Sequence, residues 1–229
     1  LYDPALLPQG EEAAALLREA ISRGERIRIV GDYDIDGVCA TYILYRGLLQ
    51  VREALGRKEA EGGIDYVIPH RIRDGYGINR HIIEKALSDG VDLIITCDNG
   101  IAALEELRFA REQGIRVIVT DHHDIRLTEE GEEQLPPAAV VDPKLRDSRY
   151  PVRNICGAVV AWKLLLLLYR MCGLSREAWL SFLDFAALAT VGDVMELQGE
   201  NRIIVRYGLK SLTEGCRNQG LYSLINRCG

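Results

Sequence analysis

Short runs of β-branched and other apolar residues alternate with stretches whose apolar positions recur every three to four residues. The short runs predict buried strands at Arg26–Gly31, Ile64–Pro69, Val91–Asp98, Ile115–Asp121 and Ala138–Asp142. The stretches before and between them predict helices at Glu11–Arg23, Val38–Val51, Ile78–Ser88 and Ile101–Glu112. This alternation is typical of a parallel sheet with helices on both faces. We therefore expect an α/β fold with a five-stranded, mainly parallel sheet.

The pattern changes towards the end of the chain, where the strand signal disappears from Gly157 onward. Helices are predicted there at Ala158–Arg170, Arg176–Ala189 and Arg202–Thr213. The sequence thus predicts an α/β body at residues 1–150 and a mainly helical segment at 151–229 that completes the site. Two charged stretches, Val51–Gly63 and Arg126–Pro137, are predicted to be surface insertions.

The composition is that of an ordinary globular protein, with 229 residues, 48% of them hydrophobic and 27% charged. This excludes a disordered, collagen-like or membrane-spanning chain. The longest apolar stretch, Ala158–Tyr169, is interrupted by Lys163 and is shorter than the ~20 residues that a membrane helix needs. The net charge of −6 argues against a strongly basic surface. Nucleic acid stays a candidate partner, because an acidic cleft that holds divalent cations can receive phosphates.

The six cysteines form no C-x-x-C pair, and several lie inside apolar runs. Such cysteines are typical of reduced thiols inside the cell rather than of a disulfide framework. The chain begins at Leu1, and no pattern of a secretory signal follows it. We therefore expect a trimmed piece of a cytoplasmic protein without a membrane anchor.

Acids and histidines stand directly after three of the predicted strands. In an open parallel sheet, ligands bind beyond the carboxyl ends of the strands, which makes these positions candidates for chemistry. The segments are Asp32-Tyr33-Asp34-Ile35-Asp36-Gly37, Asp98-Asn99-Gly100 and Asp121-His122-His123-Asp124, and a later helical stretch adds Gly192-Asp193. A lone acid in such a place is most often a helix cap or a turn residue, but four clusters at strand ends or beside them favour a functional site.

The alternating carboxylates of Asp32, Asp34 and Asp36 resist joint ionisation unless a cation lies among them. The pattern resembles the start of an EF-hand calcium loop, but Ile43 stands where that loop needs glutamate, and a strand rather than a helix precedes it. Carboxylates together with imidazoles favour Mn²⁺, with Mg²⁺ as the alternative ion, and the lack of paired cysteines disfavours structural zinc. Several carboxylates and two histidines can hold two ions, and such pairs activate water for phosphoryl displacement.

The four clusters, in this order, resemble the motifs of the DHH phosphoesterase superfamily. The resemblance is to its RecJ-like branch, the single-stranded-DNA-specific exonucleases, and it extends over essentially the whole chain. Further matching segments are Tyr2-Asp3-Pro4, Ile68-Pro69-His70-Arg71 leading to Gly75-Tyr76-Gly77, Val141-Asp142-Pro143, and Asn154-Ile155-Cys156-Gly157-Ala158. Some branches carry a metal-binding histidine where this chain has Val30, so one ion must use other ligands or water.

The resemblance implies a role for each of the motif residues. Asp34 and Asp36 begin two metal sites, Asp98 bridges the ions, and the expected ligand set is completed by His122 and Asp193. His123 would face the phosphate and stabilise charge on its oxygens, while Asp121 would orient an imidazole. Asp32 would lie behind the ligands or act as an occasional ligand.

The residues themselves suggest four substrate contacts. Arg71 suits a phosphate and Tyr76 could stack on a base, although a solvated basic turn is the plain alternative. Asn154 and Gly157 stand where a helix N-terminus could bind phosphate, with simple helix capping as the alternative.

The resemblance implies a metal-dependent 5′→3′ exonuclease that hydrolyses single-stranded DNA to mononucleotides in DNA repair and recombination, with replication or repair proteins as further partners. RecJ-like enzymes continue into a DHHA1 domain and an oligonucleotide-binding fold, so we expect this chain to be the N-terminal catalytic half. One alternative is a small-substrate phosphoesterase acting on oligoribonucleotides, cyclic dinucleotides or phosphoanhydrides. Another is a metal-free DHH scaffold that binds DNA or replication proteins.

Overall fold

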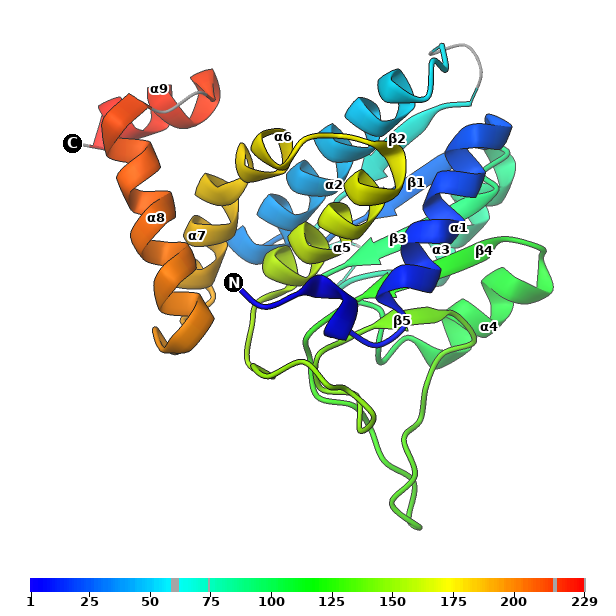
Figure 1. The fold of residues 1–229 in the computed structure, drawn as a ribbon. Helices are drawn as coiled ribbons and strands as arrows, with labels where there is room; N and C mark the ends of the chain where they lie inside the picture. The colour runs from blue at the N-terminus through cyan, green and yellow to red at the C-terminus, as the bar shows by residue number, and fades with distance from the viewer. Residues whose placement is uncertain (59–61, 74, 216–217, 229) are drawn as a thin grey trace.

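The computed structural model describes residues 1–58, 62–73, 75–215 and 218–228, and its centre is a five-stranded sheet (Figure 1). The strands are β1 (Ile27–Val30), β2 (Ile64–Val67), β3 (Leu93–Cys97), β4 (Arg116–Thr120) and β5 (Ala139–Val141). Their order is β2-β1-β3-β4-β5, and each neighbouring pair is parallel. Each strand lies within its predicted range, and the predicted α/β fold is confirmed. In register, Val30 pairs with Thr96, and Cys97 pairs with Thr120, so the strands end together at one edge.

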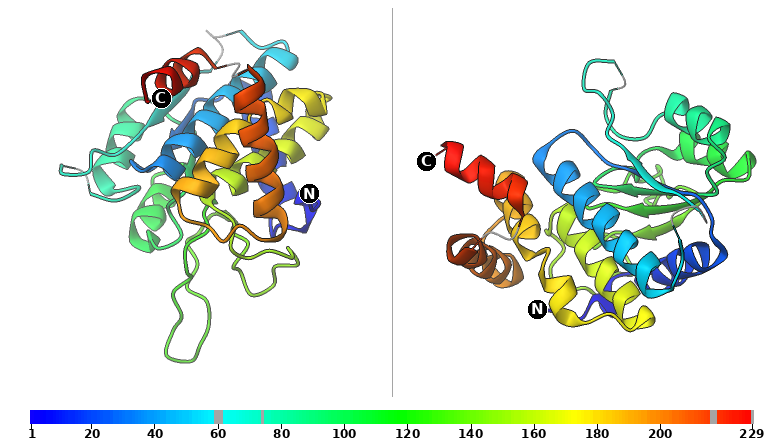
Figure 2. Two further views of the ribbon diagram at one scale, coloured as in Figure 1. Left: turned by 90° about the vertical axis from the view of Figure 1, so that its left-hand side faces the viewer. Right: turned by 90° about the horizontal axis from the view of Figure 1, so that it is seen from above.

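Helices cover both faces of this sheet, as the view from above makes plain (Figure 2). One face carries α1 (Gly10–Arg23), α2 (Ile35–Ala54) and α5 (Gly157–Cys172), whose apolar side chains share one core with the sheet. The other face carries α3 (Arg80–Ser88) and α4 (Leu104–Glu112), which pack in a second core. The β-branched residues of β1, β3, β4 and β5 are buried, because helices exclude water from both faces of the sheet.

The last part of the chain is helical, as predicted, but the helix expected at Arg176–Ala189 is two helices. α6 (Arg176–Leu180) ends before α7 (Leu183–Gly192) begins. The indole rings of Trp162 and Trp179 stack at 3.9 Å, and each indole N–H donates to the other residue's backbone carbonyl. The Trp179 carbonyl also accepts from Phe182 N, so it is engaged outside the α-helical pattern. The tertiary contact between the two tryptophans therefore accompanies the end of α6.

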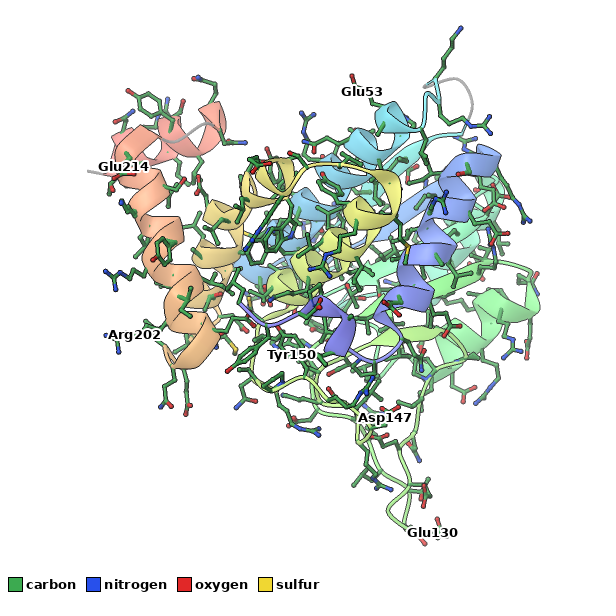
Figure 3. The ribbon with its side chains drawn as sticks, in the orientation of Figure 1. Glu53, Glu130, Asp147, Tyr150, Arg202 and Glu214 are labelled. Atoms are coloured by element: carbon green, nitrogen blue, oxygen red, sulfur yellow. The ribbon has the colours of Figure 1, made fainter. Side chains whose placement is uncertain are left out.

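Two further helices follow, α8 (Gly199–Gly215) and α9 (Gln219–Cys228), of which α9 was not predicted. A buried ion pair holds the start of α8 against α5, since Lys163 Nζ lies 2.5 Å from Glu200 Oε1. Glu200 also accepts from the hydroxyl of Tyr150 and from Tyr2 N, and Lys163 donates to the Tyr2 carbonyl at 2.8 Å. Figure 3 labels Tyr150 beside the start of the chain. This network explains the lysine that interrupts the apolar stretch.

The proposed division at residue 150 stays a prediction. α5 lies in the second segment, yet its apolar side chains complete the core that α1 and α2 form on the sheet. In the described part of the chain, this helix is buried along nearly its whole length from Gly157 to Tyr169. The α/β body and the start of the helical segment are therefore packed as one unit.

The predicted insertion Arg126–Pro137 is a long loop that projects from the body, with the exposed Glu130 at its tip (Figure 3). The predicted insertion Val51–Gly63 lies partly outside the described residues, and α2 extends into it as far as Ala54. No helix among the described residues is both long and apolar enough to cross a membrane. The five described cysteines are free thiols, whereas Cys216 lies outside the described residues.

Candidate metal centre

The motif residues meet at the carboxyl edge of the sheet. Asp34 caps α2, where its Oδ1 accepts from Gly37 N at 2.9 Å. Asp98 follows β3, His122 follows β4, and Asp193 follows α7, which packs against α2. Parallel strands bring their ends to one edge, and the packing of α7 adds an acid from about seventy residues further along the chain.

The imidazole of His122 lies among three carboxylates. Its Nε2 is 3.1 Å from Asp98 Oδ1, 3.5 Å from Asp36 Oδ2 and 3.7 Å from Asp193 Oδ2. Two ligands at right angles on one ion, each about 2.1 Å from it, lie about 3 Å apart. The geometry is therefore close to that of ligands around a shared cation.

A second group of oxygen ligands lies beside the first. Carboxylate oxygens of Asp32, Asp34 and Asp98 lie within 4.8 Å of one another, and Asp98 also forms such a group with His122 and His123. Asp98 thus lies both with Asp32 and Asp34 and beside His122, which supports its proposed bridging role. Asp32 has a ligand atom in the second group, so the geometry favours ligation by this residue more than the sequence did.

Burial makes these carboxylates unusually basic in the absence of a cation. It raises the pKa of Asp98 to about 11, with the charges of Asp36 and Asp34 adding to the effect. Burial and the same two charges raise the pKa of Asp193 to about 6. Burial lowers the pKa of His122, which favours the neutral imidazole that binds metals.

Several buried atoms at this site lack a hydrogen bond from any described residue: Asp32 Oδ2, Asp98 Oδ1 and Asp193 Oδ2. Buried carboxylate oxygens are costly unless they are hydrogen-bonded, protonated or bound to metal. The unpartnered oxygens and the neutral imidazole fit a pair of divalent cations such as Mn²⁺, since oxygen and imidazole ligands suit that ion.

The role of Gly157 in binding substrate phosphate stays a prediction, and its backbone N–H donates to a carboxylate of the protein. Gly157 N donates to Asp36 Oδ2 at 2.6 Å, and Ala158 N donates to Asp36 Oδ1 at 2.8 Å. The first turn of α5 therefore holds the carboxylate of Asp36. The sequence pattern indicated an anion at this helix end, but it did not indicate which anion.

His123 forms a dyad with Asp121 beside the candidate ligands. His123 Nδ1 lies 2.7 Å from Asp121 Oδ1, and Asp121 also accepts from His122 N and Ile101 N. The hydrogen bond to Asp121 raises the pKa of His123, against the opposing effect of burial. Burial would raise the pKa of Asp121, but the hydrogen bond and charge of His123 lower it overall. The dyad therefore favours the charged form of an imidazole whose side chain is 46% exposed.

The predicted substrate contacts fall into two groups. The guanidinium of Arg71 lies 5.3 Å from the ring centroid of Tyr33, and the Tyr33 and Tyr76 rings meet edge to face. The Tyr76 hydroxyl donates to the Asp98 carbonyl at 2.9 Å and lies 3.2 Å from His123 Nε2. Asn154 is exposed, and its carbonyl accepts from Asn201 Nδ2. Arg71 and Tyr76 thus lie at the candidate site, and binding by Asn154 stays a prediction.

Comparison with known families places these elements in a wider context. Residues 26–190 match the DHH family, N-terminal domain, and this match spans well over half of the chain. The chain belongs to the DHH family. The matched range includes β1 to β5 and the candidate ligands from Asp34 to His122, and it ends just before Asp193.

Relatives of this DHH-family chain are longer proteins. It is 37% identical over 228 residues to the single-stranded-DNA-specific exonuclease RecJ of Bacillus subtilis (strain 168), which covers 100% of this chain and 26% of that protein. It is 42% identical over 207 residues to the RecJ of Thermus thermophilus, covering 90% of this chain and 28% of that protein. A solved structure of exonuclease RecJ bound to manganese matches with a TM-score of 0.74 and 40% identity, over 89% of this chain and 48% of that one. The chain therefore spans about a quarter of the length of these two curated relatives.

The structure of this DHH-family chain adds a residue whose role the sequence reasoning missed. Asn99 Oδ1 accepts from Ile78 N, while its Nδ2 donates to the carbonyls of Val30 and Cys97. This buried amide joins the ends of β1 and β3 to the loop that carries Tyr76. The position of Asn99 directly after Asp98 was the signal in the sequence that could have indicated its role. Its partners Ile78 and Val30 are distant in sequence, so that position does not identify them.

Proposed function

We propose that this chain is the catalytic part of a metal-dependent 5′→3′ exonuclease that hydrolyses single-stranded DNA to mononucleotides in DNA repair and recombination. The observation that carries the proposal is the convergence of Asp34, Asp36, Asp98, His122 and Asp193 at one sheet edge. The similarity to proteins named RecJ supports the substrate and the reaction. The proposed place of action is the cytoplasm, where its DNA substrate and reduced thiols both occur.

Two Mn²⁺ ions held by these five residues, with Asp32 as a further ligand, would lower the pKa of water and offset charge on the phosphate. The remaining residues position the substrate. His123, whose charged form the hydrogen bond with Asp121 favours, would donate to a phosphate oxygen and stabilise the negative charge that develops there. Arg71 beside Tyr33 would bind a neighbouring phosphate, and the exposed edge of Tyr76 would contact a base.

The first experiment is hydrolysis by the purified chain with Mn²⁺, using long single strands, short oligonucleotides and a chromogenic phosphodiester. The net charge of −6 and the small aromatic content predict weak, salt-sensitive binding of long strands. Hydrolysis of short substrates should therefore persist at salt concentrations that abolish processive digestion. Processive digestion of long strands at moderate salt would contradict this expectation and show that the surface that binds long strands lies within this chain.

The same measurements separate the alternatives. A preference for dinucleotides over single-stranded DNA of any length would favour a small-substrate phosphoesterase. Purified chain that binds DNA but neither Mn²⁺ nor Mg²⁺ would favour a metal-free scaffold. Release of mononucleotides from the 5′ end, and not the 3′ end, is the result that the proposed function requires.

A further inference from the structure

Lys144 lies in the loop after β5, and its backbone is fixed on both sides. Its N–H donates to Asp142 Oδ1 at 2.8 Å, and its carbonyl accepts from the guanidinium of Arg153 at 3.0 Å. The Lys144 side chain is only 25% exposed, so most of its aliphatic stem is covered. The loop therefore presents the ammonium group from a restrained position.

The Lys144 ammonium is paired with a carboxylate that is easily exchanged. Nζ lies 2.9 Å from Asp124 Oδ1, and the side chain of Asp124 is 94% exposed. Ion pairs with an exposed partner contribute little to stability, because water solvates the separated charges almost as well. Another anion, such as a phosphate group, could thus replace Asp124 at small cost.

This ammonium belongs to the surroundings of the metal centre. Asp124 directly follows His123, and both line a hollow of about 310 Å³ together with Tyr76 and Asp121.

A series of contacts beside the site links one cation, Arg71, to another, Lys144. It consists of Arg71, Tyr33, Tyr76, His123, Asp124 and Lys144, each in contact with the next or adjacent to it in the chain. Cations near aromatic rings are features that bind single strands, because phosphates pair with the charges while bases stack. Arg71 supplies a cation at one end of the series, and the sequence assigned none to the other end.

We propose, on the basis of the proposed function, that Lys144 binds a phosphate of the single strand at the metal centre and exchanges Asp124 for phosphate oxygens. A lysine suits this role as a compact charge with three donors that can follow a moving phosphate. The ligand is therefore a phosphodiester or a terminal phosphate of the strand. Lys144 is a substrate-binding residue in this proposal and does not ligate the cations.

The test compares Lys144→Met and Lys144→Arg with a control, Lys85→Met. Lys85 is also paired with an aspartate, Asp89, but it lies before β3 at the opposite edge of the sheet. Single-stranded DNA hydrolysis with Mn²⁺ should show about a tenfold higher KM for Lys144→Met, the usual effect of losing one hydrogen bond to a charged group. Lys144→Arg should stay within about threefold of the unaltered chain because it keeps the charge, and Lys85→Met should show no change in KM.

Mn²⁺ affinity, measured by electron paramagnetic resonance, distinguishes phosphate binding by Lys144 from a merely structural role. Removal of a positive charge beside the site should leave Mn²⁺ binding unchanged or tighter in Lys144→Met, while DNA binding weakens. Weakening of both would overturn the proposal and show that Lys144 only maintains the fold of the site.

Oligonucleotides with one uncharged methylphosphonate identify the phosphate. At one position, near the 5′ terminus or within the strand, the methylphosphonate should raise the KM of the unaltered chain about tenfold. The KM of Lys144→Met should not rise further at that position. Equal losses in both proteins at every position would refute the contact. If the unaltered chain hydrolyses no DNA, the proposed function fails, whereas normal hydrolysis with an unchanged KM in Lys144→Met refutes the Lys144 proposal alone.

Discussion

The carboxylate of Asp36 accepts a hydrogen bond from the backbone N–H of Gly157 at 2.6 Å, although 121 positions separate them in the chain. The contact joins the first turn of α2 to the first turn of α5. Amides at a helix N-terminus can hold an anion, so the first turn of α5 orients the Asp36 carboxylate. The candidate ligand is thus held by backbone groups, whose positions the core fixes.

Replacement of Gly157 by alanine should disrupt this arrangement. A Cβ atom at position 157 would lie 2.7 Å from Asp98 Cβ, which is closer than two carbon atoms can pack. We expect Gly157→Ala to lower stability by about 1–3 kcal/mol and to weaken Mn²⁺ binding, because Asp36 or Asp98 must move. Urea denaturation and metal titration measure the two effects. Gly63→Ala is the matched control, since its new Cβ would meet no atom closer than 3.8 Å; equal effects of both substitutions would contradict the explanation.

Asp98→Ala should abolish both Mn²⁺ binding and hydrolysis, because Asp98 belongs to both groups of candidate ligands. Its loss leaves neither position with a complete set of donors. The bound metal can be counted by elemental analysis after gel filtration. Retention of two tightly bound ions would refute the bridging role. Asp147→Ala, an exposed aspartate outside these groups, serves as the control.

His123→Ala should keep the metals and lose turnover. His123 is held by Asp121 and Tyr76 at the edge of the site, so its proposed partner is the phosphate. Removal of one preorganised donor to developing charge lowers kcat by roughly 10²–10³. Parallel measurements of kcat and of Mn²⁺ content test this expectation. Loss of metal from His123→Ala, with metal retained by His122→Ala, would show that the roles of the two histidines are reversed.

The stability of the metal-free chain should depend on Asp142. Burial raises the pKa of this carboxyl to about 7, from 3.8 for an exposed aspartate. The folded chain thus holds the proton more tightly than the unfolded chain, so stability falls as the pH rises from about 4 to 7 and the loss then stays constant. Asp142→Asn should raise Tm, and the increase should be larger at pH 8 than at pH 5.

Thermal unfolding in the presence of a chelator measures this difference. The amide oxygen of the Asp142→Asn side chain can still accept from Lys144 N, so the substitution removes the charge with little change in hydrogen bonding. An increase in Tm of the same size at both pH values would contradict the titration of Asp142 as its cause. Asp147→Asn, on the exposed part of the same loop, should change Tm little at either pH.

The sequence by itself determined the sheet and most of the candidate site. Buried parallel strands require apolar runs, and β1, β3 and β4 are such runs, each followed within two positions by an acid. Because the carboxyl ends of parallel strands meet at one edge, the positions of Asp34, Asp98 and His122 along the chain already placed them together.

Only the tertiary structure decided which groups face one another across that edge. Gly157 stands at a helix N-terminus for which the sequence predicted an anion, and the packing of α5 against α2 brings the Asp36 carboxylate to its N–H. The stacked pair of Trp162 and Trp179 accompanies a helix end that local periodicity does not predict. Lys144 reaches the site because its loop returns beside Asp124. Each of these contacts joins residues distant in sequence, and local patterns of hydrophobic and polar residues carry no information about which distant partner the folded core brings into reach.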